Sequence, residues 1–425
     1  MTGAGMQGHS RFVGRGWWVA VLLLPACAPS RPSTPPVPLP ATVPRVAVRP
    51  GLEVLISDSF SLVAGKRVGL VTNLAAVDAQ GVGAIPRLRA AGVNLVALFG
   101  PEHGLSASAA PGERVASSVD TAYNIPIYSL YGRTVAPTAE MLAGIEVLLV
   151  DLPDVGARYY TYPATTVHVM QAAATQRIPV VILDRPNPIG GAMQGNILDT
   201  AYASMVGRLA VPMRHGLTLG EEARLAQADL QIPVELHVVP VTGWRRRMTF
   251  AATGLPFRAP SPNLQDIESL FHYPGTCLFE GTALSVGRGS DAPFHQVGAP
   301  WLDTTAVLAR MRMAHLPGVA FRGVSFTPRS PGDKKFADTA VVAIRLILTD
   351  PTRYNPTRTA VYLLAAIRAV HPELIRLGGS FDRLAGGPVL RLALLRGDAA
   401  AQIVASWGAG EAAFQQRVKP WLLYR

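Results

Sequence analysis

Short apolar runs alternate along the chain with segments of helical character. The clearest runs cover residues 93–100, 146–150 and 179–183, and all three are rich in Val, Leu and Ile. A candidate helix lies between neighbouring runs, so the pattern predicts buried parallel strands in an α/β sheet. The same pattern predicts further strands at residues 66–73, 234–240 and 339–348, and helices at residues 84–91, 137–144, 165–176, 219–230, 306–314, 356–370 and 399–405.

Polar side chains follow each of the three clearest runs directly. Glu102 and His103 come after the first run, Asp151 and Asp154 after the second, and Asp184 after the third. In an open α/β sheet, ligands bind outside the carboxyl ends of the strands. We therefore expect a polar ligand site at this edge of the sheet, which favours an enzyme.

The length of 425 residues predicts two domains, because single hydrophobic cores stop growing well below this size. A Pro-rich segment at residues 256–262 is a plausible boundary between them. We expect a Rossmann-like parallel-sheet α/β domain over residues 50–258. A smaller α/β (α+β) C-terminal domain over residues 259–425 is expected to follow and to complete the cleft.

The N-terminus has the pattern of an export signal. Arg11 and Arg15 precede an apolar stretch at residues 17–24, which is too short to cross a membrane. We expect a signal peptide over residues 1–26. Residues 27–49 are rich in proline and are expected to form an extended tether.

The segment Leu24-Pro-Ala-Cys27 resembles the lipobox of bacterial lipoproteins, in which the cysteine is lipidated. An ordinary signal peptide with an incidental cysteine is the alternative. Ala28 follows the cysteine, instead of the aspartate that retains lipoproteins in the inner membrane of enteric bacteria. The sequence therefore predicts an outer-membrane lipoprotein that faces the periplasm.

The net charge of +11 favours anionic partners. Loss of Arg11 and Arg15 with the signal peptide would leave +9, since no acidic residue precedes Cys27. Arg245-Arg-Arg beside Trp244 is the one cluster of basic and aromatic residues, so we do not expect nucleic-acid binding.

The sequence carries no signal for a cofactor or a metal. Cys27 and Cys277 are the only cysteines, so a lipidated chain has no internal disulfide and too few thiols for a cysteine-based zinc site. The motifs His-Glu-x-x-His, Gly-x-Gly-x-x-Gly and the P-loop are missing, which disfavours a zinc protease and a nucleotide-binding protein. No Gly-x-Ser-x-Gly elbow occurs, and Ser285 lacks that context, so a serine hydrolase whose triad lies outside this motif is a further alternative.

Eight motifs in order give the chain a specific resemblance. They lie at residues 101–104, 151–162, 184–191, 214–221, 261–263, 273–282, 287–289 and 407–424. Together they resemble the NamZ-type exo-β-N-acetylmuramidases, long known only as a domain of unknown function, over about residues 51–425. The resemblance implies a Rossmann-like domain with a smaller C-terminal domain and an active site in the cleft between them. It also implies an exo-acting hydrolase without a cofactor, which removes terminal N-acetylmuramic acid from the non-reducing ends of peptidoglycan fragments.

Glycoside hydrolysis usually needs a carboxylic acid that protonates the leaving oxygen and a second group that acts at the anomeric carbon. We assign the acid to Glu102, which follows a buried strand where burial disfavours the charged form. His103 is expected to orient Glu102 or to bind the sugar. Asp154 and Glu280 are the candidates for the second carboxylate.

The remaining site residues are candidate substrate contacts. Guanidinium groups match carboxylates in a bidentate way, so three arginines are candidates for the lactyl carboxylate of muramic acid. Two tyrosines are candidates to stack on a sugar face, and Asp151 and Asp184 are expected to fix the loops at the strand ends. The arginines are Arg158, Arg214 and Arg288, the tyrosines are Tyr160 and Tyr162, and the candidate contacts to hydroxyl or acetamido groups are Asn73, Asn187 and His215.

The chain departs from the family motifs at several loop positions. They are Leu74-Ala-Ala after Asn73, Pro153 in the aspartate loop, Leu264-Gln265 after Ser-Pro-Asn, and Ala283 where asparagine is usual. A lost polar contact can cost a site orders of magnitude in specificity. A non-catalytic periplasmic binder of cell-wall fragments is therefore the alternative to an active glycosidase.

Overall fold

The computed structural model describes residues 14, 16, 47–110, 112, 113 and 115–425. Cys27, and nearly all of the expected signal peptide and tether, lie outside the described residues. The described residues from 47 to 425 form one compact unit, so the expected domain boundary near residue 258 stays a prediction. None of the helices described here is both long and apolar enough to cross a membrane.

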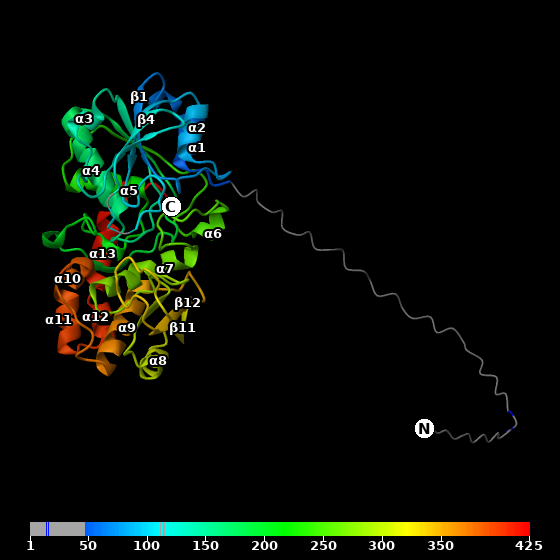
Figure 1. The fold of residues 1–425 in the computed structure, drawn as a ribbon, viewed down its shortest axis with the longest axis vertical. Helices are drawn as coiled ribbons and strands as arrows, with labels where there is room; N and C mark the ends of the chain where they lie inside the picture. The colour runs from blue at the N-terminus through cyan, green and yellow to red at the C-terminus, as the bar shows by residue number, and fades with distance from the viewer. Residues whose placement is uncertain (1–13, 15, 17–46, 111, 114) are drawn as a thin grey trace. The chain divides into compact units, whose positions relative to one another are not determined.

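The first half is built on a seven-stranded sheet in the order β3-β4-β2-β1-β5-β6-β9 (Figure 1). Every neighbouring pair is parallel except β3 and β4. Its six parallel strands are ordered 3-2-1-4-5-6 along the chain, which is the Rossmann order with its switch point between β1 and β5. The strands are β1 (Arg67–Thr72), β2 (Asn94–Gly100), β3 (Ser118–Asp120), β4 (Ile125–Ser129), β5 (Val147–Asp151), β6 (Val180–Leu183) and β9 (Leu236–Val239).

Helices cover both faces of this sheet. In β5, Val147 and Leu149 belong to one hydrophobic core, while Leu148 and Val150 belong to the other. Figure 1 shows α1 and α2 on one side of the sheet and α3 and α4 on the other. The helices of this half are α1 (Gly51–Asp58), α2 (Ala84–Ala90), α3 (Ala139–Leu142), α4 (Thr161–Gln176), α5 (Leu219–Asp229) and α6 (Phe250–Thr253). Between α4 and α5 along the chain, β7 (Gln194–Ile197) and β8 (Pro212–Arg214) form an antiparallel pair.

The second half combines a small antiparallel sheet, in the order β10-β12-β11, with helices. Its strands are β10 (Gln296–Ala299), β11 (Val319–Phe326) and β12 (Val341–Leu348). Its helices are α7 (Ile267–Thr276), α8 (Thr304–Met313), α9 (Pro356–Val370), α10 (Gly379–Ala385), α11 (Val389–Arg396), α12 (Ala400–Ala405) and α13 (Gly408–Arg417). The expected fold class, a Rossmann-like domain with a smaller mixed α/β part, is confirmed.

Three elements of the structure differ from the prediction, and each difference has a physical reason. Helix α4 begins at Thr161, four residues earlier than predicted, because Pro163 falls in its first turn, where no intrahelical N–H is needed. Helix α7 was not predicted, since Pro274 and Gly275 near its end interrupt the helical pattern, although the side chain of Asp266 caps its first turn. Strand β11 was also missed, because it is an edge strand with mostly exposed or half-exposed positions.

Candidate active site

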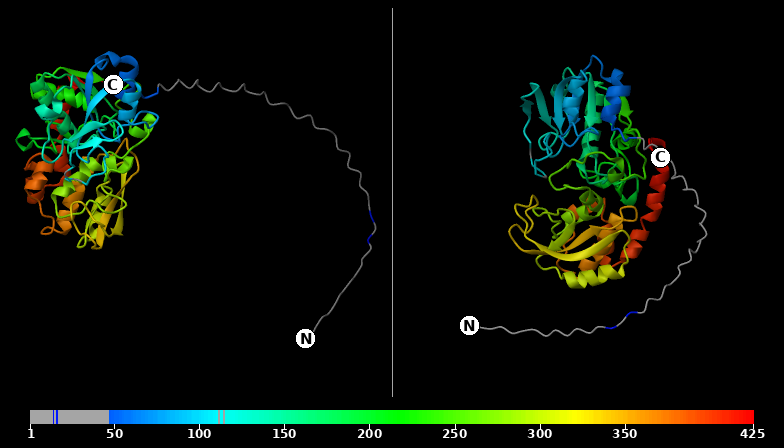
Figure 2. Two further views of the ribbon diagram at one scale, coloured as in Figure 1. Left: turned by 45° about the horizontal axis from the view of Figure 1, so that its top comes forward. Right: turned by 90° about the vertical axis from the view of Figure 1, so that its right-hand side faces the viewer.

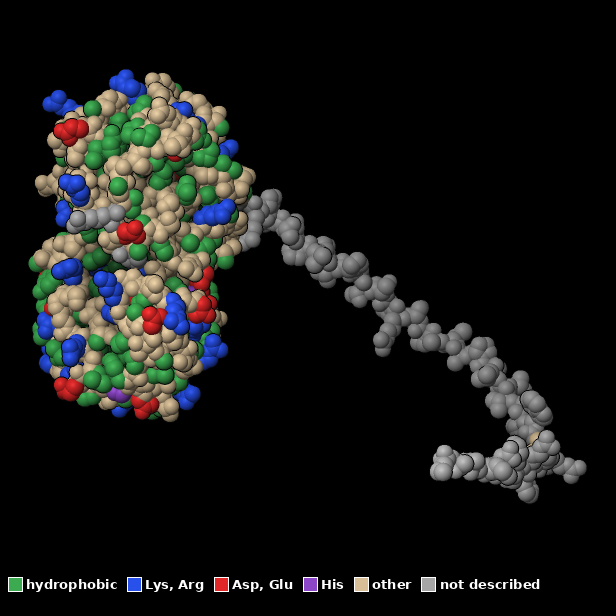
Figure 3. Space-filling model, viewed as in Figure 1, with side chains coloured by type: hydrophobic (Ala, Val, Ile, Leu, Met, Phe, Trp, Pro, Cys, Tyr) green, Lys and Arg blue, Asp and Glu red, His purple; other side chains and the backbone are tan. Residues whose placement is uncertain are grey.

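A cavity of about 350 Å³ opens between the two halves of the body. Figure 3 looks onto the hollow between these halves. The loop after β2 and the segment from β5 to α4 form one wall, and the end of α7 with the loops that follow it forms the other. The lining side chains that can carry chemistry are Glu102, His103, Tyr131, Thr161, Cys277, Glu280, Arg288 and Asp333.

Glu102 is fixed in the cavity wall by donors from several segments. The Thr161 hydroxyl donates to its Oε2 at 2.8 Å, and the Gly112 N–H donates to its Oε1 at 3.2 Å. Burial, and then the negative charge of Glu102, raise the pKa of Tyr131, whose hydroxyl therefore keeps its proton at neutral pH. With both oxygens held, the carboxyl group has one orientation, as proton transfer to a bound substrate requires.

His103 lines the cavity beside Glu102 in a strained backbone conformation. Its φ of 69° lies in the left-handed region, which costs energy for a residue with a β-carbon. Nδ1 lies 2.7 Å from the Ala109 carbonyl oxygen, which can only accept, so Nδ1 carries the proton. Burial lowers the pKa of His103, and the neutral ring therefore presents Nε2 as an acceptor.

Arg288 supplies a cation on the opposite wall. Its Nε donates to Glu280 Oε1 at 2.6 Å, and its guanidinium lies over the Phe294 ring, 5.0 Å from the centroid. The Cys277 thiol contacts the other oxygen of Glu280 at 3.5 Å. Nη1 of Arg288 is buried and has no hydrogen-bond partner among the described residues, and the Arg288 side chain lines the cavity.

Sequence reasoning missed several polar side chains of this cavity, among them Tyr131, Thr161 and Asp333. Tyr131 and Asp333 lie in loops where no apolar pattern points to a role, and Thr161 was read only as part of a motif. Oδ2 of Asp333 is buried without a partner in the described part of the chain. The Lys335 ammonium group donates to the backbone carbonyls of Glu280 and Leu284 and ties the Asp333 loop to the wall, a contact that no sequence pattern marks.

Comparisons with known proteins identify the family. Two family models match the chain. The model for the N-terminal part of exo-β-N-acetylmuramidase NamZ matches residues 68–268, and the model for its C-terminal part matches residues 271–424. The peptidoglycan β-N-acetylmuramidase NamZ of Bacillus subtilis (strain 168) is 39% identical over 387 residues, which is 90% of this chain and 93% of that protein. The chain belongs to the NamZ family. The family expected from the motifs is confirmed, and so is the expected enzyme class, a glycosidase.

Two solved structures from Bacteroides fragilis NCTC 9343, both DUF1343 family proteins, share the fold. One is 32% identical with a TM-score of 0.82, covering 90% of this chain and 100% of its own. The other is 28% identical with a TM-score of 0.70, covering 89% of this chain and 99% of its own. The NamZ fold is therefore retained over the whole body of the protein.

Two of the three arginines expected to bind the lactyl carboxylate have other partners in this NamZ chain. Arg158 is 3% exposed and donates to the carbonyl oxygens of Asn196, Val211 and Leu384. Arg214 donates to the Gln194 side chain and to backbone carbonyls, and it lies outside the cavity. These two expectations are corrected: the guanidinium groups satisfy buried carbonyls, and Arg288 remains the cation of the cavity.

The expected contacts from Asn73, Tyr162 and Asn187 are corrected in the same way. Nδ2 of Asn73 donates to the Tyr162 hydroxyl at 2.7 Å, and this hydroxyl donates to the Pro260 carbonyl at 3.0 Å. Asn187 is 1% exposed and bonds the backbone of its own loop and of Leu217. All three fix the loops behind the cavity, whereas Tyr160 lines the cavity and remains the candidate to stack on a sugar.

Asp154 and His215 form a buried cluster with Glu222 outside the cavity. Nε2 of His215 lies 3.3 Å from Asp154 Oδ2, and Nδ1 accepts the Leu217 N–H at 3.2 Å. Asp154 faces a different hollow of about 50 Å³, so its expected role as the second carboxylate is corrected. Asp151 and Asp184 do fix loops, since Asp151 pairs with Arg185, and Asp184 accepts from Thr218 at 2.7 Å and from Tyr424 at 2.5 Å.

A larger groove of about 1160 Å³ lies near the C-terminus, and several arginines line it, among them Arg245 and Arg247. Figure 2 (right) shows the C-terminus and α13 on one side of the body, away from the yellow loops of the second half. No carboxylate side chain is among the described residues that line this groove, so it lacks an acid for glycoside hydrolysis. The smaller cavity around Glu102 is therefore the candidate active site.

Replacing Glu222 by glutamine is expected to flatten the pH dependence of stability. Burial raises the pKa of Glu222 from 4.5 to about 8, so between these values the folded protein keeps a proton that the unfolded chain releases. The free energy of unfolding therefore falls as pH rises through this window, by up to about 1 kcal/mol per pH unit. Thermal unfolding from pH 4.5 to 8 would show a shallower fall of Tm for Glu222→Gln, whereas Glu235→Gln, at an exposed position, should match the wild type.

Proposed function

We propose that this protein is an exo-acting muramidase that releases terminal N-acetylmuramic acid from the non-reducing ends of peptidoglycan fragments during cell-wall turnover. One observation carries the proposal: Glu102 and Arg288, a cation with one nitrogen left unpartnered among the described residues, line the same cavity from opposite halves of the body. The carboxyl group suits proton transfer to a glycosidic oxygen, and the guanidinium group suits the lactyl carboxylate that distinguishes muramic acid.

The chemistry follows from these positions. The Glu102 carboxyl donates its proton to the glycosidic oxygen while the bond from that oxygen to the anomeric carbon breaks. A water molecule supplies the oxygen that ends on the anomeric carbon, and its proton restores Glu102 or its partner acid. The cavity volume of about 350 Å³ is near the lower limit of ligand sites, which fits one sugar residue and an exo mode of action.

The structure offers two carboxylates in the cavity for the second role. Glu280 is engaged by Arg288 on one oxygen and by the Cys277 thiol on the other. Asp333 keeps one buried oxygen without a partner among the described residues. Glu280 and Asp333 are therefore the two candidates for the group that acts at the anomeric carbon, and Glu280 also positions Arg288.

The sequence departures leave the cavity nearly intact, which supports an enzyme over a binding protein. Leu264 lines the cavity, whereas Leu74, Pro153, Gln265 and Ala283 do not. The polar groups around Glu102 are therefore retained.

A test of the function is the release of free muramic acid from two soluble glycans. The expected substrate is a disaccharide with N-acetylmuramic acid at its non-reducing end. A trisaccharide in which N-acetylglucosamine caps that end is expected to remain intact. Binding of the disaccharide without cleavage would support the non-catalytic alternative, and cleavage of both glycans would exclude the exo mode.

We further propose that the protein is exported and lipidated at Cys27, with the membrane anchor in the outer membrane and the body facing the periplasm. The lipobox-like segment and the Pro-rich stretch support this proposal. Labelling of cells with an alkyne fatty acid should mark the wild type and not Cys27→Ser. An unlabelled wild type, or equal labelling of both, would contradict lipidation at Cys27.

A further inference from the structure

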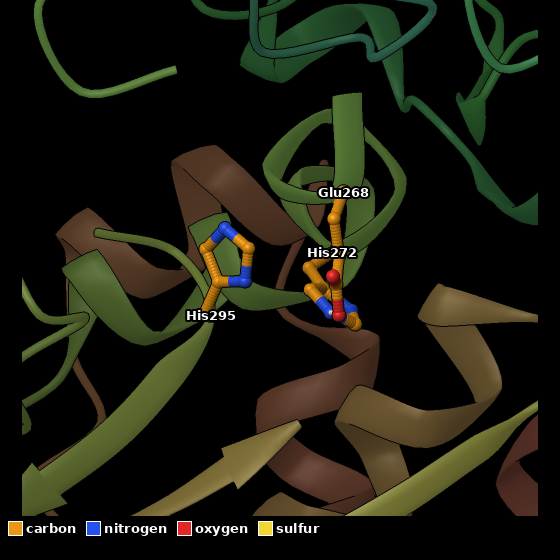
Figure 4. Close-up of side chains that lie close together, drawn as sticks. All are labelled: Glu268, His272 and His295. Atoms are coloured by element: carbon orange, nitrogen blue, oxygen red, sulfur yellow. Dashed lines mark hydrogen bonds and ion pairs between the residues drawn. The ribbon is translucent and has the colours of Figure 1, made fainter. Parts of the chain in front are cut away.

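Two histidines and two carboxylates gather in the second half, outside the candidate active site. Glu268 and His272 are one turn apart on α7, and His295 directly precedes β10 (Figure 4). One ligand atom from each of these three side chains lies within 4.8 Å of the other two. His272 is fully buried and His295 nearly so, while the Glu268 side chain is 39% exposed, so the cluster reaches the surface.

The hydrogen bonds of His295 fix its tautomer. Its Nε2 lies 3.1 Å from both carboxylate oxygens of Asp266, which can only accept, so Nε2 carries the proton. Figure 4 shows the other ring nitrogen turned toward His272 and Glu268. This nitrogen, Nδ1, holds a lone pair, and the hydrogen bonds of the ring in the described part of the chain all go through Nε2. A carboxylate on the far nitrogen is the usual arrangement behind a metal-binding histidine.

His272 offers a second nitrogen to the same space. Its Nδ1 lies 2.9 Å from the Tyr354 hydroxyl, and its Nε2 lies 3.4 Å from Glu268 Oε1. A distance of 3.4 Å is long for a hydrogen bond to a carboxylate. It is close to the separation of about 3.3 Å between two ligands on a tetrahedral ion with bonds of about 2.0 Å.

We propose that Glu268, His272 and His295 bind a zinc ion through Glu268 Oε, His272 Nε2 and His295 Nδ1. Two histidines and one glutamate form a known zinc ligand set, in which a water or substrate atom takes the fourth position. Tyr354 would accept the proton of His272 Nδ1, and Asp266 already accepts that of His295 Nε2. Both ligands would thus have an outer hydrogen-bond partner, as zinc-binding histidines require.

The other cluster with suitable residue types, Asp154, His215 and Glu222, does not meet these conditions. Nδ1 of His215 accepts the Leu217 N–H, so the neutral ring carries its proton on Nε2, which faces Asp154. A metal ion at Nε2 would have to displace the proton there. Nδ1 could not take up that proton, because it accepts the Leu217 N–H. Burial raises the pKa of Glu222 to about 8, so at neutral pH its carboxyl group carries a proton and not a metal ion.

A zinc ion at the first cluster would join two segments that carry the cavity wall. Helix α7 supplies Tyr273 next to His272, and the loop before β10 supplies Phe294 next to His295. Bridging these segments would hold the wall that carries Arg288, because the Arg288 guanidinium lies over the Phe294 ring. The proposal concerns this wall and does not depend on the reaction in the cavity.

The test is titration of the chelator-treated full chain with Zn²⁺ alone, followed by calorimetry, with Co²⁺ as a spectroscopic probe. We expect one ion per chain and the visible absorption of four-coordinate cobalt. His295→Gln and Glu268→Gln should each weaken binding more than about 100-fold, and Asp266→Asn about 10- to 100-fold. His237→Gln, at an exposed histidine, should bind as the wild type.

Zinc-free thermal unfolding of each variant checks that it folds, and His295→Gln is the main variant because His295 is less buried than His272. A wild type that binds no Zn²⁺ would overturn the proposal. Binding that survives His295→Gln and is lost in His215→Gln would place the ion at the other cluster and would also overturn it.

Discussion

Replacing Glu102 by glutamine is expected to lower kcat/KM on a muramic acid disaccharide by about 10²- to 10⁴-fold, the range of general acid catalysis. Glutamine keeps the shape of the side chain: its oxygen can accept from the Gly112 N–H, and its NH2 group can donate to the Thr161 hydroxyl, which reverses its role. The cavity should therefore be preserved. The loss should be smaller on an aryl N-acetylmuraminide, because a good leaving group needs little protonation. Steady-state kinetics on the two substrates measures both effects.

The control is Glu235→Gln, which makes the same chemical change at an exposed position and should leave kcat/KM on both substrates unchanged. An equal loss of kcat/KM on the disaccharide and on the aryl N-acetylmuraminide would show that Glu102 does not act by protonating the leaving group. Retention of activity on the disaccharide would remove Glu102 from the reaction altogether.

Arg288→Lys is expected to reduce kcat/KM for N-acetylmuraminides by about 10- to 100-fold, since a charge-assisted hydrogen bond contributes about 1.5–3 kcal/mol. Lysine keeps a positive charge next to Glu280 but lacks the fork that lets Nε hold Glu280 while Nη1 meets the substrate. The corresponding N-acetylglucosaminide has no lactyl carboxylate, so its slow turnover should change little. The ratio of the two rates therefore measures the role of Arg288.

Arg329→Lys is the matched control, because Arg329 forms an exposed ion pair with Asp338 outside the cavity lining. If Arg288→Lys lowers kcat/KM equally for both substrates, Arg288 stabilises the wall and does not bind the lactyl carboxylate.

Much of the sheet could be predicted because its strands are buried on both faces and read as unbroken apolar runs. The polar residues at their ends include Glu102 and His103, which line the cavity, since the Rossmann order directs these ends to one edge. The second half was harder to predict. Strand β11 lies at a sheet edge, and α7 contains Pro274, so neither shows the regular pattern of its class.

The site could be predicted only in part, because residue type does not reveal which groups a side chain will meet. Arg158 and Arg288 are both buried arginines in family motifs, yet one donates to three backbone carbonyls and the other keeps a nitrogen unpartnered in the described structure. That difference depends on carbonyls distant in sequence, such as Leu384. Asp333 was missed for the same reason, since its loop joins the site only through the folded chain.

A structure of the Glu102→Gln variant bound to a disaccharide of N-acetylmuramic acid and N-acetylglucosamine would test the account most directly. We expect the muramic acid in the 350 Å³ cavity, with its glycosidic oxygen at the side chain of position 102 and its lactyl carboxylate on Nη1 of Arg288. A disaccharide bound in the arginine-lined groove near the C-terminus, with the cavity around position 102 free of sugar, would contradict the account.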